Sequence, residues 1–97
     1  MTVPENDWSN KGGTGTRNCS CGSWKQHWLN FSRKIWPNNC SRYGCSNLPS
    51  LGGHVINQRY AGEQIVPLCE SCNQYSGKFD LKYGVTLVSA NRTETCG

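Results

Sequence analysis

Two closely spaced pairs of cysteines are the residues in this sequence whose types and spacing most clearly indicate chemistry. Four residues separate Cys40 from Cys45, and 23 residues later two residues separate Cys69 from Cys72. Zinc in structural sites takes four ligands in a tetrahedron, and each pair can present two thiolates to one ion. The two-residue spacing lets backbone amides point at the sulfur atoms, which stabilises thiolate over thiol. The sequence therefore predicts a four-thiolate zinc site.

A second set of candidate ligands uses the cysteines that remain. Cys19, Cys21 and Cys96 would supply three thiolates, and His27 would supply an imidazole to complete the set. These residues lie far apart in the sequence, so free thiols, or a His27 exposed on its helix, are the alternatives. We therefore predict one zinc ion per chain, and two if the second set assembles.

The cysteines also bear on the cellular compartment. There are seven of them, an odd number that excludes a complete set of intrachain disulfides. The chain begins without the basic segment and apolar run of a signal peptide, and no stretch approaches the roughly 20 apolar residues of a membrane span. Clustered cysteines in a reducing compartment are typical metal ligands. We expect a cytoplasmic monomer without membrane association; a secreted, disulfide-linked domain is the alternative, because the sequence contains N-x-[ST] triplets.

Composition favours stabilisation by a metal over stabilisation by a large core. The chain has 97 residues, of which only 35% are hydrophobic and 11 are glycine. A chain of this size buries a limited share of its surface, so small domains of this composition usually need a metal or disulfides. The net charge is +4, and the basic residues are scattered. That balance permits contact with nucleic acid without requiring it.

The order of elements predicts a single α+β domain. Residues 1–18 are polar and rich in glycine, so we expect a flexible tail followed by one zinc-binding domain over 19–97. An amphipathic helix is predicted over 23–35, with Ser23 as its cap and Pro37 beyond its end. Apolar residues recur on one face of this helix, which we expect to be buried. They are Trp24, Trp28, Phe31 and Ile35.

Short strands and a second helix are predicted in the remainder of the chain. Residues 54–57 and 65–68 are expected to pair as a hairpin around a loop that contains Gly62. A short helix is predicted over 70–76, and the composition of 85–89 predicts a C-terminal strand.

Residues 40–79 resemble the HNH, or His-Me finger, family, whose zinc-containing members have a treble-clef scaffold. The first cysteine pair matches, as does Gly53-His54-Val55 at the start of the hairpin. The segment QIVPLCESCN, residues 64–73, is similar to the family's NLQPLCxxCN segment. The resemblance implies a small treble-clef-like domain, a β-hairpin plus a short helix joined by zinc. In this chain an N-terminal amphipathic helix and a C-terminal strand are added to it.

The resemblance also implies roles for two residues. In nucleases of the family a histidine is the general base, and a residue on the final helix helps to hold Mg²⁺ or Mn²⁺ at the phosphodiester. By position, His54 matches the base and Asn73 matches the metal ligand. Gly53 stands where the family has an acidic ligand, and Gln64 stands where it has an asparagine. Because glycine has no side chain to bind the cation, we predict that the chain is not an enzyme.

Three functions follow from these features. The first is a non-catalytic zinc module that binds DNA or RNA, or a protein, with Arg59, Lys78 and Lys82 flanking the hairpin and helix. The second is an HNH endonuclease that uses His54, Asn73 and Mg²⁺ or Mn²⁺. The third is a protein-binding inhibitor or adaptor that uses exposed tryptophans as its contact surface. The tryptophans are Trp8, Trp24, Trp28 and Trp36. We rank the non-catalytic zinc module first.

Overall fold

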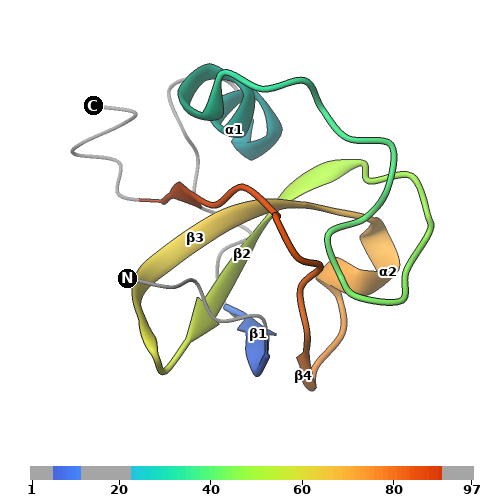
Figure 1. Ribbon diagram of the computed structural model, residues 1–97, viewed down its shortest axis with the longest axis vertical. Helices are drawn as coiled ribbons and strands as arrows, with labels where there is room; N and C mark the ends of the chain where they lie inside the picture. The colour runs from blue at the N-terminus through green and yellow to red at the C-terminus, as the bar shows by residue number, and fades with distance from the viewer. Residues whose placement is uncertain (1–5, 12–22, 91–97) are drawn as a thin grey trace.

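A five-stranded antiparallel sheet and two helices form the part of the chain that the computed structural model describes, residues 6–11 and 23–90. The strands lie in the order β4-β1-β2-β3-β5 (Figure 1). Their bounds are β1 Trp8–Asn10, β2 Leu51–Asn57, β3 Tyr60–Leu68, β4 Lys78–Phe79 and β5 Val88–Ser89, and the helices are α1 Trp24–Ser32 and α2 Glu70–Asn73. The predicted α+β class is confirmed. Neither helix is long and apolar enough to span a membrane.

The β2–β3 hairpin is the centre of the sheet. Its register runs from Leu51 opposite Leu68 to Val55 opposite Gln64, and it becomes irregular beyond that point. The predicted hairpin is confirmed, but both strands extend beyond 54–57 and 65–68. Gly62 lies on β3 beside the irregularity, not in the connecting loop as predicted. Pairing on both sides of β2 and β3 outweighs the weak strand preference of their glycine and alanine residues.

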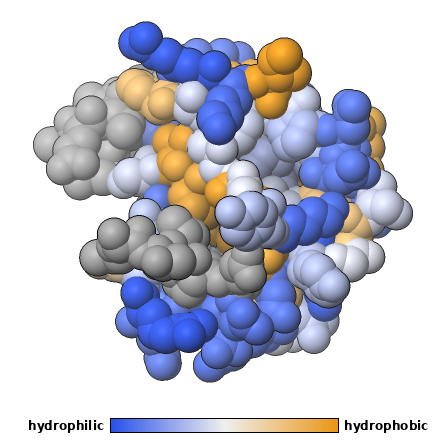
Figure 2. Space-filling model, viewed as in Figure 1, coloured by the Kyte–Doolittle hydropathy of each residue, from blue (hydrophilic) through white to orange (hydrophobic). Residues whose placement is uncertain are grey.

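Alternation of side chains gives this hairpin two buried faces. On one face, Ile65 packs beneath α1 in a cluster with Trp28, Val88 and Ala90. On the opposite face, strand residues pack against cysteines. This second cluster comprises Trp8, Cys40, Val55, Val66, Leu68, Cys69, Cys72, Phe79 and Leu81. Figure 1 shows α1 lying over the hairpin and α2 following the end of β3. On the surface seen in Figure 2, hydrophobic residues lie in separate groups among hydrophilic ones.

Helix α1 begins as predicted and ends early. The Ser23 hydroxyl accepts a hydrogen bond from the backbone N–H of Gln26 at 3.0 Å. After Ser32, Arg33 adopts a left-handed conformation with φ of 58°, and its N–H donates to the carbonyl of Leu29 at 3.2 Å. This bond closes the last turn, so the helix stops before Pro37 has any influence on it.

The early end of α1 changes which residues the helix buries. Ile35 lies beyond it and is 93% exposed, while Phe31 is 44% exposed. The predicted apolar face is therefore wrong at these two positions and right at Trp28, which is buried. His27 is fully buried instead, because its Nε2 lies 2.8 Å from the backbone carbonyl of Ser89 and the ring is thereby satisfied.

Part of the predicted flexible tail is a strand. β1 lies between β2 and β4, with Ser9 opposite Ile56 and Trp8 opposite Phe79. Trp8 is fully buried, and a side chain of this size contributes a large apolar area to a small core. The prediction for residues 1–18 is thus wrong at Trp8–Asn10. Its remaining residues, apart from 6, 7 and 11, lie outside the described residues.

The last predicted elements are present but short. Helix α2 is one turn within the predicted 70–76, and β5 is two residues within the predicted 85–89. β5 pairs with β3 through Ser89 opposite Gln64 and Val88 opposite Ile65. The two residues of β4 were not predicted, because their pairing depends on β1.

The burial of Trp8 predicts a large effect on stability. Trp8→Ala should lower the free energy of unfolding by about 3–5 kcal/mol, the usual cost of truncating a large core aromatic. Ile35→Ala, at an exposed position, should change it by less than about 0.5 kcal/mol. Denaturant unfolding followed by circular dichroism measures both. Equally small changes in the free energy of unfolding for the two variants would contradict the conclusion that Trp8 on β1 is part of the core.

Candidate metal centre

A tight turn positions the first pair of cysteines. The backbone N–H of Cys45 donates to the carbonyl of Arg42 at 3.1 Å, and Gly44 between them has φ of +85°. Side chains other than glycine rarely adopt that conformation, so the turn depends on Gly44. The N–H of Cys40 donates to the carbonyl of Asn47 at 2.8 Å, which closes the loop that carries both thiols.

The end of β3 and the start of α2 position the second pair. Cys69 directly precedes α2, and its carbonyl accepts a hydrogen bond from the N–H of Asn73 at 3.0 Å. Cys72 lies within the helical turn and is buried. The backbone N–H of Cys69 points at the Cys40 sulfur, 3.4 Å away. This bond runs from the second pair to the first. Within the second pair, a backbone hydrogen bond from Cys72 to the Cys69 sulfur lowers the pKa of Cys69, which is the contact that the two-residue spacing predicted.

The structure brings the four sulfur atoms of Cys40, Cys45, Cys69 and Cys72 within 4.8 Å of one another. The Sγ atoms of Cys45 and Cys69 are 3.8 Å apart, far longer than the roughly 2.05 Å of a disulfide. Zinc–sulfur bonds of about 2.3 Å in a tetrahedron imply sulfur separations of about 3.8 Å. The cluster can therefore hold a metal ion such as zinc.

Electrostatics explains why this cluster suits a cation. Burial, followed by the neighbouring thiols of Cys69, Cys40 and Cys45, raises the pKa of Cys72 to about 12. Burial also raises the pKa of Cys40. Several thiolates this close together repel one another, so deprotonating all four requires a compensating positive charge. A divalent cation supplies that charge, and thiols that coordinate one lose their protons.

Cys69 is the thiol whose surroundings favour the thiolate. Its burial raises the pKa, but hydrogen bonds outweigh that effect and lower it to about 6. The Ser71 hydroxyl lies 3.4 Å from the sulfur, and the side-chain amide of Asn47 donates to it at 3.7 Å. Sequence reasoning did not identify these two residues, although each lies two positions from a ligand cysteine, which is a usable signal.

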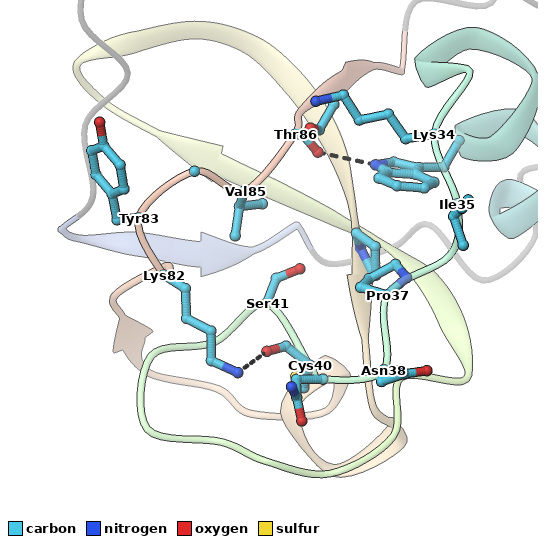
Figure 3. Close-up of a pocket in the computed structure, with 14 residues that line it drawn as sticks. Lys34, Ile35, Pro37, Asn38, Cys40, Ser41, Lys82, Tyr83, Val85 and Thr86 are labelled. Atoms are coloured by element: carbon cyan, nitrogen blue, oxygen red, sulfur yellow. Dashed lines mark hydrogen bonds between the residues drawn. The ribbon is translucent and has the colours of Figure 1, made fainter.

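Lys82 fastens the first cysteine loop. Its ammonium donates to the carbonyl of Cys40 at 2.6 Å (Figure 3) and to the carbonyl of Cys45 at 2.5 Å. Its backbone N–H also donates to the carbonyl of Ser41 at 2.9 Å. The ammonium thus fixes both ligand residues of the loop and places a positive charge beside a site that thiolates make negative. Sequence analysis named Lys82 as a basic residue near the hairpin and helix, but not as a partner of the cysteine loop, because it lies 37 positions from Cys45.

Asn10 performs a similar role for the second pair. From β1, its side-chain amide donates to the carbonyl of Cys72 at 2.8 Å and to that of Tyr75 at 2.9 Å. The Cys72 carbonyl also accepts from the N–H of Tyr75 at 3.2 Å, so Asn10 ties β1 to the end of α2 and to the turn that follows it. The strand that sequence analysis assigned to a tail therefore holds the helix that carries a ligand.

The two residues that the HNH resemblance singled out are not brought together. His54 is buried beneath α1, with its ring centroid 4.4 Å from that of Trp24. Asn73 lies on the other face of the hairpin, since its Oδ1 would stand 2.8 Å from a Cβ on Gly53. That Cβ would also collide with Leu68, so an acidic residue at position 53 has no room.

The second predicted ligand set is described only at His27. Cys19, Cys21 and Cys96 lie outside the described residues, so a second site stays a prediction. The alternative of an exposed His27 is wrong, because the residue is fully buried with Nε2 beside the Ser89 carbonyl.

No protein-family model, curated protein or solved structure matches this chain. The resemblance to the HNH family therefore stays a prediction. The interpretation of the site rests on its residues and their geometry.

The tryptophans do not form an exposed surface. Trp8 and Trp28 are buried, and Trp24 and Trp36 are half-buried. The indole N–H groups of Trp28 and Trp36 donate to backbone carbonyls, each at 3.0 Å. The expectation of exposed tryptophans as a contact surface is wrong, because the rings pack in the core and satisfy their polar atoms there.

The Lys82 contacts predict an effect on metal affinity. Lys82→Met should lower the affinity for zinc about 10- to 100-fold, the usual effect of removing a residue that orients metal ligands. Lys82→Arg should restore part of it, and Lys78→Met, at an exposed lysine, should have no effect. Competition with a chromophoric chelator measures the affinities, and the visible spectrum of the Co²⁺ form reports the ligand geometry. Identical affinities for Lys82→Met and Lys78→Met would contradict this role.

Proposed function

We propose that this chain is a non-catalytic nucleic-acid-binding module whose fold depends on a structural zinc ion at Cys40, Cys45, Cys69 and Cys72. The observation that carries the metal part is the four-sulfur cluster at a spacing suited to tetrahedral zinc. Tetrahedral all-thiolate sites are typical of zinc or iron. With four protein ligands no position is left for a substrate or a reactive water, which is the pattern of structural zinc.

The arrangement of the ligands supports a treble-clef-like unit. A loop carries the first cysteine pair, the β2–β3 hairpin follows, and the second pair lies at the junction of β3 and α2. The ion would join three segments: the loop, the hairpin end and the one-turn helix. Four free thiols in one cluster also suit a reducing compartment, which supports a cytoplasmic location.

Charge supports nucleic acid as the partner. The described ranges contain eight lysines and arginines against four acidic residues. Phosphate groups attract such a surface, and release of their counterions contributes to affinity. Of the three basic residues expected to flank the hairpin and helix, Arg59 and Lys78 line one pocket with Asp7, and Lys82 lines another. The basic residues are therefore distributed over the surface.

The separation of His54 from Asn73 supports a non-catalytic role. A general base must lie within hydrogen-bond reach of the water that it activates, close to the cation that binds the phosphate. His54 is buried under α1, and Asn73 lies across the hairpin. The lack of room for a carboxylate at Gly53 also removes the best cation ligand that the nuclease arrangement would have.

Removal of the metal tests the structural role. Protein purified under reducing conditions without added metal should contain zinc, and a strong chelator should unfold it, because structural zinc contributes on the order of 10 kcal/mol in zinc-finger peptides. Cys69→Ser should abolish binding at this site, whereas Ser46→Ala, at an exposed neighbour of Cys45, should not. Elemental analysis and circular dichroism measure both effects. A metal-free protein that resists chelation but unfolds on reduction would contradict the proposal.

Salt dependence tests the partner. Zinc-loaded protein should bind labelled oligonucleotides without added Mg²⁺, and raising salt from 50 to 200 mM should weaken binding about 20-fold for a single strand and about 40-fold for a duplex if about three phosphates are contacted. Fluorescence anisotropy measures this, and plasmid incubated with Mg²⁺ should stay intact. Absence of binding at low salt would contradict the proposal. Plasmid cleavage that is lost in His54→Ala would favour the endonuclease instead.

A further inference from the structure

A groove with a volume of about 340 Å³ lies between two segments that lack regular structure. One wall is the chain that follows α1, residues 34–41, and the other is residues 82–86 (Figure 3). Trp28 and Pro67 contribute to it from α1 and β3. A volume of this size is at the lower end of those that accommodate small ligands in proteins.

The groove differs from two smaller pockets in its charge. Lys34 and Lys82 line it, and none of its lining residues is acidic. The other two pockets both contain Asp7, and one of them also contains Asp80. The four acidic residues of the described ranges therefore all lie outside this groove. Its charge fits an anionic occupant.

The Lys82 ammonium is held in place before any ligand arrives. Two of its three N–H donors point at the carbonyls of Cys40 and Cys45. Its charge is thus fixed at the groove, and the third N–H remains for a further acceptor. Because the side chain is already ordered, an anion that binds there incurs little of the usual entropy cost of ordering a lysine.

Two large apolar side chains at the groove are almost fully exposed. Tyr83 on one wall is 92% exposed, and Ile35 on the other is 93% exposed. Figure 3 shows them on opposite sides of the groove. Asn38 and Asn39 add side-chain amides that can donate and accept hydrogen bonds. A fixed positive charge, an open aromatic ring and amide groups form the combination that proteins use for bases and phosphates together.

We propose that this groove binds a short single-stranded segment of nucleic acid, with one phosphate at Lys34, another at Lys82 and a base stacked on Tyr83. The proposal rests on the proposed function and specifies the site and the form of the nucleic acid. Base stacking on an aromatic ring needs an unpaired base, whereas readers of duplex usually insert a helix or ribbon into the major groove. Helix α2, with four residues, is a single turn and too short for that role.

Paired variants at exposed positions test the groove without disturbing the metal centre. Tyr83→Ala should weaken binding of a labelled ten-nucleotide dT or rU oligomer about 5- to 100-fold, the range for loss of one stacked base. Lys34→Gln should lower the slope of log affinity against log salt by about 0.7, the loss of one phosphate contact to a single strand. The controls are Tyr43→Ala, at a tyrosine that is 71% exposed away from the groove, and Lys11→Gln, at an exposed lysine that does not line it. Neither control should change the affinity by more than about twofold.

The outcomes of these experiments distinguish failure of the groove proposal from failure of the proposed nucleic-acid-binding function. If the wild-type protein binds no nucleic acid, both fail. If it binds but Tyr83→Ala and Lys34→Gln match their controls, the groove proposal fails alone. The groove proposal is also overturned if Tyr83→Ala weakens the binding of a duplex as much as that of the single strand. It is likewise overturned if polyglutamate displaces the labelled oligomer as well as an unlabelled oligomer does. Photo-cross-linking of a 5-iodouracil oligomer to Tyr83, located by mass spectrometry, supports it, and comparison of dT with rU identifies DNA or RNA as the preferred strand.

Discussion

The convergence of four thiols in a space of 4.8 Å is the interaction on which the rest of this structure depends. Burial, followed by the neighbouring thiols, opposes ionisation of Cys72 and raises its pKa to about 12. A divalent cation bound there would offset the repulsion between thiolates, because it neutralises their charge and coordinates all four sulfur atoms. The loop of Cys40, the end of β3 and the single turn of α2 meet in one core cluster, and the Ser41 N–H donates to the Pro67 carbonyl at 3.0 Å. A metal bound by the thiols would add four bonds to these contacts.

The β2–β3 hairpin connects the cysteine cluster to the core beneath α1. Its two faces carry separate cores, one containing the cysteines and one beneath α1. Glycines allow both layers to come close to the strand: a side chain at Gly52 would meet the backbone of Trp24, and one at Gly53 would meet Leu68. The glycine that departs from the nuclease pattern is thus explained by packing.

The sequence predicted what depends on local spacing. The cysteine spacing identified the four clustered thiols, the Ser23 cap marked the start of α1, and composition located the hairpin. It did not predict features that depend on distant partners. β1 forms because Trp8 fills a core that other segments create, and Asn10 and Lys82 act through carbonyls 62 and 37 or more residues away. No local pattern records such contacts. The early end of α1 depends on the left-handed conformation of Arg33. Arginine rarely adopts this conformation, so the sequence did not predict the end of the helix there.

Lys82 connects the metal centre to the surface. The same two carbonyl contacts that brace the ligand loop also fix its charge at the groove, and Cys40 itself lines that groove. Cys40 and Ser41 belong to both the cysteine loop and the groove wall, so a metal bound by the thiols would brace that wall. By thermodynamic linkage, an anion that binds the braced wall more tightly would favour metal binding to the same degree. The proposed metal site and the proposed ligand site would then be coupled, because the same residues form parts of both.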